Sequence, residues 1–293
     1  MEQLLQVKID KLQIKKKKGK NKTIERTLFK EFELNLSAGE IIVIIGDSGS
    51  GKSTLLNIIS GFILPKNKIY LNNKETLTFI GKVTFNGKDS TYLPASERRV
   101  GLVMQRFTLY DHMSVKDNLY FPLRMRQKLS KDLMNDIVNN IISQVHLDGI
   151  DLDGKPEDLS GGQMQRIAIA KMMLNNPQIY LFDEAFSHLD FDLRQKLREQ
   201  LIINPIRNKA EKKIGVIFVT HDLMDAMTAD KILHLTTNER PILDKNGKNT
   251  TEKYITEAKW YPRECQKINA WQDFESINQF QVIKRISAIK PLV

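Results

Sequence analysis

The chain has 293 residues, 41% hydrophobic and 27% charged, which is enough for one large folded domain with an extension. Its net charge of +10 is compatible with polyanionic partners such as anionic lipid, nucleic acid or nucleotide, but a lysine-rich solvated surface is the favoured explanation. No apolar run approaches the roughly 18 residues of a membrane span, and the single cysteine, Cys265, excludes an internal disulfide.

The N-terminal region is predicted to form short strands. Leu5, Val7 and Ile9 alternate with polar residues, a period of two. The lysine run Lys15–Lys18 precedes a glycine and indicates a solvated hairpin tip, with contact to an anionic membrane surface as the alternative. Ile41–Ile45 is apolar throughout, which predicts a central strand covered on both faces.

A phosphate-binding loop follows this strand. The segment reads Gly46-Asp47-Ser48-Gly49-Ser50-Gly51-Lys52-Ser53-Thr54 and fits the pattern G-x-x-x-x-G-K-[ST] between a predicted strand and a predicted helix. Its backbone N–H groups and the helix N-terminus would bind phosphates. We expect Lys52 to reach the β- and γ-phosphates, Ser53 to offer a hydroxyl to Mg²⁺, and Thr54 to approach the α-phosphate. The helix should run over 52–60 and end at Gly61.

The middle of the chain changes from strands to helices. Residues 62–80 show no clear period, Lys82–Phe85 reads as a strand, and Asn86-Gly87 is a hairpin signal. Another strand is predicted over Val100–Met104. A helical apolar stripe then predicts a small helical subdomain at about 107–165; its members are Met134, Ile137, Val138, Ile141, Ile142 and Val145.

Two further apolar strands end in polar residues. Ile179–Phe182 leads into Asp183 and Glu184, acids that a doubly wound sheet would place near the phosphate loop. We expect Asp183 to hold Mg²⁺ and Glu184 to polarise the attacking water. Between the strands, a helix face is marked by Leu189, Leu193, Leu197 and Leu201, and Val216–Val219 leads into Thr220-His221-Asp222. Strands alternating with helices predict a mainly parallel sheet.

The sequence Leu159-Ser160-Gly161-Gly162-Gln163 lies about a hundred residues after the phosphate loop and is predicted to open a helix. In this order the two motifs resemble the ATP-binding-cassette (ABC) ATPase family over roughly residues 4–236. The resemblance implies an α/β P-loop NTPase fold of the ABC type, with a β-rich N-terminal part, an inserted helical subdomain and a short C-terminal extension. It assigns 1–236 to the nucleotide-binding domain and 237–293 to an extension that we expect to be a small helical or mixed appendage, turn-like at Asp244–Lys253.

The resemblance also implies roles for single residues, with ATP and Mg²⁺ as cofactors. Gln105 would contact Mg²⁺ or water and sense the transport partner, Asp190 would lie at a dimer interface, and His221 would hold the γ-phosphate and the water. Ser160, Gly161 and Gly162, with Gln163, would contact ATP bound to a second copy. The implied catalytic set is therefore Lys52, Glu184 and His221, and the implied metal set is Ser53, Gln105 and Asp183.

Three features depart from the family pattern. Ala185 stands where many members have a proline after the catalytic glutamate. Residues 12–18 contain no aromatic side chain that could stack on adenine, which leaves Ile14 as a substitute. Residues 62–80 and the C-terminal extension have no counterpart in the family pattern.

The resemblance favours the ATPase subunit of a transporter with separate permease subunits, paired as a homodimer or pseudo-dimer. The form of 183–190 favours import, with a solute-binding protein as a further partner, over export or lipid transport. A soluble ABC ATPase acting on nucleic acid or ribosomes is the alternative from another class, as is a regulatory or assembly ATPase, but nucleic acid is not the expected partner. With no secretion signal at its start, we expect a cytoplasmic protein, peripheral on the cytoplasmic face of the inner membrane.

Overall fold

The computed structural model describes residues 2–18, 22–72, 74–105, 109–126, 129–203, 214–220, 223–243 and 249–262. The chain forms two compact units. The first unit comprises residues 1–98 and 217–293, and the second comprises residues 99–216. The chain therefore leaves the first unit once and returns to it within strand β9 (Gly215–Val219).

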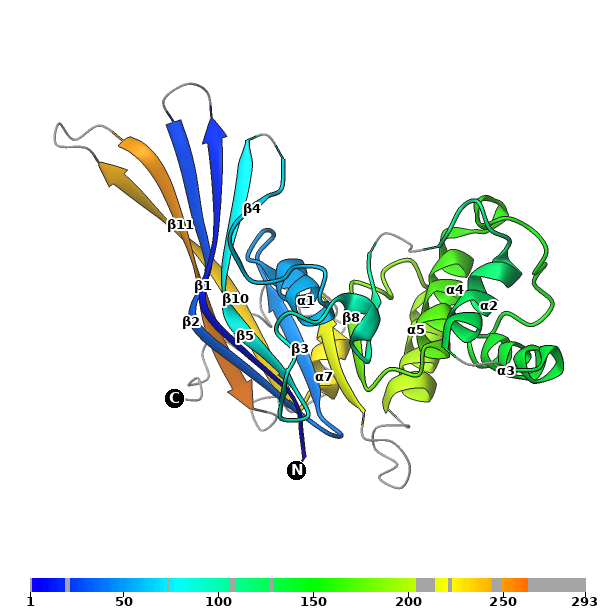
Figure 1. Cartoon of the computed structure of the whole chain (residues 1–293). Coiled ribbons are helices and arrows are strands. Elements are labelled where there is room, and N and C mark those ends of the chain that lie inside the picture. The colour runs from blue at the N-terminus through cyan, green and yellow to red at the C-terminus, as the bar shows by residue number, and fades with distance from the viewer. Residues whose placement is uncertain are drawn as a thin grey trace. The chain divides into compact units, whose positions relative to one another are not determined.

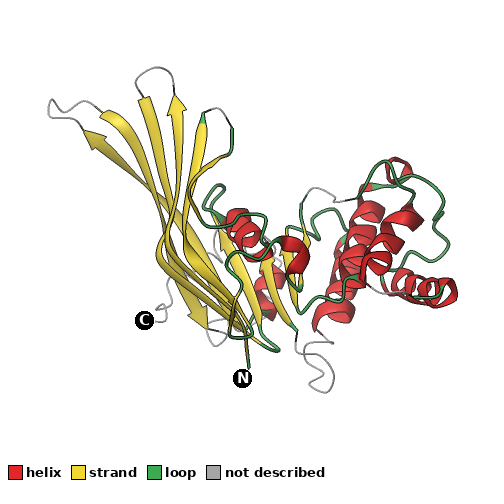
Figure 2. Ribbon diagram, in the orientation of Figure 1, coloured by secondary structure: helices red, strands yellow, loops and turns green. Residues whose placement is uncertain are grey.

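The first unit is built mainly from strands (Figure 2). Its elements are β1 (Gln3–Lys18), β2 (Lys22–Ser37), β3 (Ile41–Gly46), α1 (Lys52–Ser60), β4 (Lys66–Tyr70), β5 (Glu75–Phe85), β6 (Lys88–Asp89), a 3-10 turn at Ala95–Glu97, α7 (Leu223–Thr228), β10 (Lys231–Leu243) and β11 (Asn249–Pro262). The strand order is β4-β5-β1-β2-β11-β10-β3, and β6 pairs with β5. Figure 1 shows β1, β2, β10 and β11 as long neighbouring strands, and both α1 and α7 pack on β3.

The sheet of this unit differs from the predicted one in two respects. Its first strands are long rather than short, since β1 and β2 have 16 residues each. The sheet is mixed rather than mainly parallel, because β1 pairs antiparallel with β2 and β5 whereas β3 pairs in parallel with β10. Strands joined by tight hairpins must run antiparallel, whereas parallel pairs need a long crossover. Parallel pairing, as predicted from the alternation of strands with helices, is found between β10 and β3.

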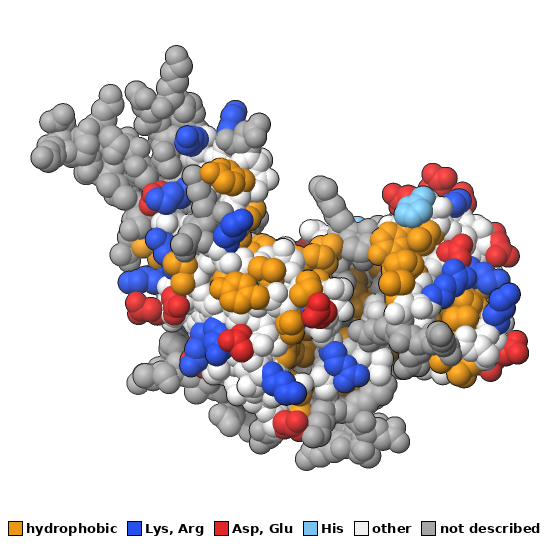
Figure 3. All heavy atoms as spheres, in the orientation of Figure 1, with side chains coloured by type: hydrophobic (Ala, Val, Ile, Leu, Met, Phe, Trp, Pro, Cys, Tyr) orange, Lys and Arg blue, Asp and Glu red, His pale blue; other side chains and the backbone are white. Residues whose placement is uncertain are grey.

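The lysine run forms the last residues of β1, at the end of the β1–β2 hairpin, and Lys15, Lys16 and Lys17 are exposed there. Lys15 forms an ion pair with Glu25 of β2 at 2.6 Å, and Lys16 pairs with Glu75 of β5 at 2.5 Å. Both lysines remain about half exposed, so each pair contributes little to stability. On the face in Figure 3, basic and acidic side chains are interspersed among the described residues, as expected for a solvated surface.

The predicted boundaries of α1 are confirmed. Gly61 ends the helix in the left-handed conformation, with φ of 86°, and its N–H donates to the carbonyl of Ile58. Arg98 binds the same helix end, because its Nη1 donates to the carbonyls of Ile58 and Ile59 at 2.8 Å each. Burial lowers the pKa of Arg98 to about 10, so the guanidinium stays charged at neutral pH and complements the negative end of the helix dipole. Arg98 thereby fixes the helix that follows the phosphate loop.

The second unit contains most of the helices (Figure 2). Its elements are β7 (Val100–Val103), α2 (Val115–Arg126), α3 (Lys131–Gln144), a 3-10 turn at Pro156–Asp158, α4 (Gly161–Leu174), β8 (Ile179–Asp183), α5 (Phe191–Arg198) and a π-helical turn at Glu199–Ile203. Strands β7 and β8 are parallel. Helix α4 packs against α2, α3 and β7, which places it at the centre of this unit.

The predicted helical stripe is confirmed as the buried face of α3. Met134, Val138 and Ile141 are at most 9% exposed, and Ser130 caps the helix by accepting the N–H of Leu133. In α4, by contrast, consecutive residues from Ile167 to Ala170 are all buried. A helix buried on all sides fits its central position.

The described part of the C-terminal region forms strands, where the sequence predicted a small helical or mixed appendage. The proposed boundary at 236/237 falls inside β10, and the segment 249–253, expected to be turn-like, belongs to strand β11. Residues 244–248 and 263–293, including Cys265, lie outside the described residues. Strand β11 pairs antiparallel with β10 and in parallel with β2. Pairing on both edges explains why this polar sequence forms a strand without a clear apolar period. Among the described residues, no helix is both long and apolar enough to span a bilayer.

Candidate active site

The phosphate loop has a backbone that only glycine adopts easily. Gly46, Gly49 and Gly51 have φ angles of 143°, 76° and 104°. A Cβ at Gly46 would lie 2.0 Å from the carbonyl oxygen of Leu235, so this position also has no space for a side chain. These glycines let the loop turn sharply between the buried strand β3 and helix α1.

The start of α1 provides a site for an anion. No side chain caps this helix end, and no acidic residue lies in its first turn, so the positive end of the helix dipole is not offset. Lys52 is buried, and its Nζ donates to the carbonyls of Gly46 and Asp47 at 2.7 and 2.8 Å. The hydroxyl of Ser50 is buried without a hydrogen-bond partner among the described residues. These features fit the phosphates of a nucleotide. When a nucleotide binds, the ammonium group of Lys52 would donate hydrogen bonds to the phosphates in place of the carbonyls of Gly46 and Asp47.

Strand β10 fixes the other side of the loop. The N–H of Asp47 donates to the carbonyl of Leu235 at 3.1 Å, and the carboxylate of Asp47 accepts the N–H of Thr237 at 2.8 Å. Strand β10 lies between β3 and β11, and its residue His234 is only 5% exposed. Sequence reasoning assigned His234 no role, because nothing in the sequence places β10 beside the loop.

We expect His234 to make the stability of the protein depend on pH. Burial lowers its pKa in the folded state; Lys259 adds to this effect and Asp47 opposes it. Below the unfolded value of about 6.5, the unfolded chain therefore binds a proton that the folded chain does not. As the pH decreases below about 6.5, we expect this residue to lower the free energy of unfolding by up to about 1.4 kcal/mol per pH unit. His234→Gln should remove that dependence.

Urea unfolding of both proteins at pH 7.5, 6.5 and 5.5 measures this difference. The same substitution at the exposed His112 controls for the loss of a histidine. Parallel pH profiles for wild type and His234→Gln would contradict the expectation.

In the second unit, the end of β8 brings two predicted residues together. The Nε2 of Gln105 donates to a carboxylate oxygen of Glu184 at 2.9 Å. Asp183 is the last residue of β8, and Glu184 directly after it has a φ of 51°. A left-handed glutamate is strained, and such strain concentrates at functional sites. Ala185, which replaces the family proline, is buried at 1% exposure.

The sequence Ser160-Gly161-Gly162-Gln163 begins helix α4, as predicted. The Oγ of Ser160 accepts the N–H of Gln163, while the Oε1 of Gln163 accepts the N–H of Ser160 at 2.8 Å. This reciprocal capping box fixes the start of the helix. The side chain of Gln165 accepts the N–H of His188 at 3.1 Å, so α4 is bonded directly to the loop that follows Glu184.

Asp190 caps helix α5 and is electrostatically linked to α4. Its carboxylate accepts the N–H of Leu193 at 2.9 Å. Burial lowers the pKa of Arg166, and the charge of Asp190 partly opposes that shift. Arg166 in turn donates to the carbonyl of Gly162 at 3.3 Å. Asp190 thus already has a structural role, in addition to the interface role that the family resemblance implies.

The segment after Gln105 is anchored by residues that sequence reasoning missed. Buried Asn118 of α2 accepts the N–H of Tyr110 at 2.7 Å and donates to its carbonyl at 3.0 Å. Lys171 of α4 donates to the same Asn118 at 3.0 Å, and its Nζ lies 3.5 Å from the centroid of the Tyr110 ring. Burial lowers the pKa of Lys171 to about 8. A long polar side chain at a helical core position is the only sequence signal that could have indicated this cluster.

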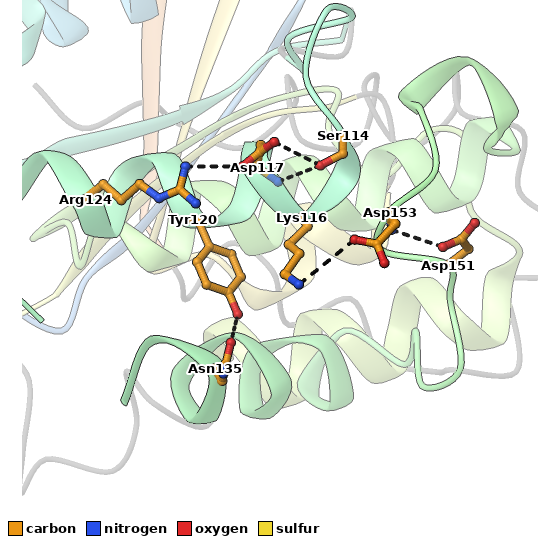
Figure 4. A network of polar contacts seen from close by, with 8 residues as sticks. All are labelled: Ser114, Lys116, Asp117, Tyr120, Arg124, Asn135, Asp151 and Asp153. Atoms are coloured by element: carbon orange, nitrogen blue, oxygen red, sulfur yellow. Dashed lines mark hydrogen bonds and ion pairs between the residues drawn. The ribbon is translucent and has the colours of Figure 1, made fainter. Parts of the chain in front are cut away.

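A second polar network links α2 to α3 and to the segment that contains Asp151 and Asp153 (Figure 4). The hydroxyl of Tyr120 is hydrogen-bonded to Asn135 of α3, and Lys116 pairs with Asp153 at 4.0 Å. Ser114 caps the first turn of α2 by accepting the N–H of Asp117 at 3.0 Å. Tyr110, α2 and α4 are therefore connected through Lys171, while α2 is also bonded to α3 and to Asp153 within the second unit.

The predicted site residues are thus found in three groups. Gly46–Thr54 form the loop of the first unit, while Gln105 with Glu184, and 160–163 with 187–190, form two clusters of the second. His221 and Asp222 lie outside the described residues.

The oxygen-rich donor set suits Mg²⁺. Among the described residues, no three or more His, Cys, Asp or Glu side chains are grouped so as to hold a metal ion by themselves. Mg²⁺ usually keeps water ligands and binds through one or two carboxylates together with substrate phosphates. Ser53 of the first unit offers a hydroxyl oxygen, and Gln105 and Asp183 of the second unit offer an amide oxygen and a carboxylate. Each is a type of ligand that Mg²⁺ accepts.

Comparison with known proteins identifies the class. A solved dimeric ATP-binding cassette, in a post-hydrolysis state bound to ADP and Pi, is 30% identical, with a TM-score of 0.64 over 78% of this chain and 93% of that chain. The fold is therefore that of an ABC-type P-loop NTPase. The ABC transporter family model matches residues 29–187, more than half of the chain, so the chain belongs to the ABC transporter family.

Curated relatives include ATP-binding proteins of importers. The spermidine/putrescine import ATP-binding protein PotA of Photobacterium profundum is 37% identical over 220 residues, covering 74% of this chain and 54% of that protein. The maltose/maltodextrin import ATP-binding protein MalK of Salmonella typhimurium is 38% identical over 213 residues, covering 70% of this chain and 51% of that protein. The chain spans about half the length of these relatives.

Proposed function

We propose that this chain binds ATP with Mg²⁺ and hydrolyses it as the ATPase subunit of a transporter, with import as the favoured direction. The observation that carries the proposal is the phosphate loop, where three left-handed glycines, an uncapped helix start and buried Lys52 form an anion site. The importer relatives support the direction, because PotA and MalK are both named import ATP-binding proteins.

The roles of the residues follow from their chemistry. Lys52 and the N–H groups of the loop bind the phosphates, and the hydroxyl of Ser53, with Gln105 and Asp183, would hold Mg²⁺. Bound Mg²⁺ would supply positive charge to offset the charge on the phosphates. Glu184 holds and orients the attacking water, and its hydrogen bond from Gln105 sets the direction of its carboxylate.

Further roles rest on the family resemblance. His221 would hold the γ-phosphate and the water, and Thr54 would approach the α-phosphate. Ser160, Gly161, Gly162 and Gln163 would contact ATP bound to a second copy, with Asp190 at the dimer interface. The position of Ser160 at the start of α4 supports this role, because the positive end of a helix dipole favours an anion.

We further propose that two copies close head to tail on ATP and that separate permease subunits receive this closing motion at the cytoplasmic face of the membrane. The clamp of Asn118 and Lys171 on Tyr110 supports this, because it joins the segment after Gln105 to the helix that begins at Ser160. A displacement of Tyr110 would therefore act on α4 through Asn118 and Lys171.

Gentle solubilisation of the tagged chain from its native cell, with mass spectrometry of what co-purifies, tests the transport function. We expect a polytopic membrane protein at near-equal stoichiometry, and a solute-binding protein in addition if the system imports. A soluble complex that carries RNA, DNA or ribosomes would contradict transport and leave the ATPase proposal intact.

A further inference from the structure

The guanidinium of Arg26 lies against the phosphate loop. Arg26 belongs to β2, and its Nη1 donates to the carbonyl of Gly49 at 3.2 Å. A Cβ at Gly49 would come within 2.4 Å of the same nitrogen, so this glycine also makes room for the arginine. A planar cation therefore sits beside the exposed part of the loop.

Tyr254 of β11 stacks with this arginine. Strand β11 pairs in parallel with β2, and the register places Tyr254 directly opposite Arg26. The Cζ of Arg26 lies 5.0 Å from the centroid of the tyrosine ring, within the range of a cation–π contact. Two flat groups from strands far apart in the sequence thus meet beside the phosphate loop.

We propose that Arg26 and Tyr254 form the subsite for the base of the nucleotide whose phosphates occupy the loop; this inference rests on the proposed function. Every base has a π face, and both aromatic rings and guanidinium planes stack on it. The N–H groups of the loop would bind the phosphates. The guanidinium of Arg26, which is hydrogen-bonded to the exposed Gly49, and the ring of Tyr254 are therefore suited to the base. Ile14, where the sequence predicted the base contact, pairs with Arg26 across β1 and β2. Residues 12–18 contain no aromatic side chain, so the ring beside Arg26 comes from β11 instead.

The alternative ligand for Arg26 alone is a phosphate group, since guanidinium binds phosphate well. A tyrosine ring beneath the guanidinium contributes little to a phosphate but extends the flat surface for a base. Tyr254 therefore distinguishes the two ligands. Through Tyr254, strand β11 would take part in nucleotide binding.

Affinities of the full-length chain for ATP and for inorganic tripolyphosphate test the proposal. We expect Tyr254→Leu to weaken ATP binding by roughly five- to a hundredfold, the range for loss of one stacked base, and to leave tripolyphosphate binding unchanged. Tyr254→Phe keeps the ring and should bind ATP like wild type. Arg26→Ala should weaken ATP binding more than tripolyphosphate binding.

The controls separate this subsite from the loop and from the fold. Tyr92→Leu changes a tyrosine that is 72% exposed in the same unit and should bind both ligands normally. Thermal unfolding of each variant reports its folding. ATP affinity of a folded Tyr254→Leu equal to wild type would overturn the subsite, as would an equal loss for both ligands. Lys52→Ala tests the phosphate loop separately. If this variant and wild type bind tripolyphosphate equally, the proposed phosphate site in the loop is wrong, whatever Tyr254→Leu shows.

Discussion

Glu184→Gln should bind ATP normally, hydrolyse it at least roughly tenfold more slowly, and accumulate as an ATP-bound dimer. The substitution keeps the length of the side chain and can still accept a hydrogen bond from Gln105, which lies 2.9 Å from the carboxylate in the wild type. It removes the negative charge that polarises water. Because glutamine tolerates the left-handed backbone as well as glutamate does, the φ of 51° should persist.

Phosphate release, ATP affinity and light scattering after gel filtration measure the three expected effects. Glu157→Gln is a matched control, since Glu157 is an exposed glutamate in the 3-10 turn at Pro156–Asp158. Hydrolysis by Glu184→Gln at the wild-type rate would remove Glu184 from the proposed role. Loss of ATP affinity would instead indicate that the carboxylate supports the nucleotide site.

The parts of the fold that could be predicted are those specified by local sequence. The apolar run of β3, the phosphate loop and Gly61 define α1 within one continuous segment, and the predicted bounds 52–60 match the structure. The stripe around Met134 predicted α3 for the same reason, because helical periodicity is visible in a short window. Ser160 likewise begins α4 through a capping box with Gln163, three residues away.

What could not be predicted depends on contacts between distant segments. β11 is polar and becomes a strand by pairing with both β2 and β10. The contacts of Arg26 with Gly49 and Tyr254 therefore have no signal in any local window. Strand β4, at Lys66–Tyr70, lies in a stretch without a clear period and is held by β5. In each case tertiary pairing outweighs local preference.

A mixture of Ser160→Arg chains with Lys52→Ala chains should pair in the presence of ATP, although neither variant pairs with itself. Each composite site is proposed to need Lys52 from one copy and Ser160 from the other. The mixed dimer keeps one site with both residues intact and one site with both altered. Glu184→Gln in both chains would slow hydrolysis so that the pair persists during measurement.

Affinity capture of the tagged Lys52→Ala chain, with and without ATP, measures the untagged Ser160→Arg chain that it retains. Arginine at Ser160 also removes a helix cap, at a cost of about 1 kcal/mol. Ser130→Arg is the matched control, because Ser130 caps α3 in the same way and has no proposed role at a second copy. If Ser130→Arg chains pair with themselves in ATP while Ser160→Arg chains do not, the defect comes from the interface rather than from the cap. Failure of the mixture to pair in ATP would contradict the head-to-tail arrangement, because an intact composite site would then be insufficient to join two copies.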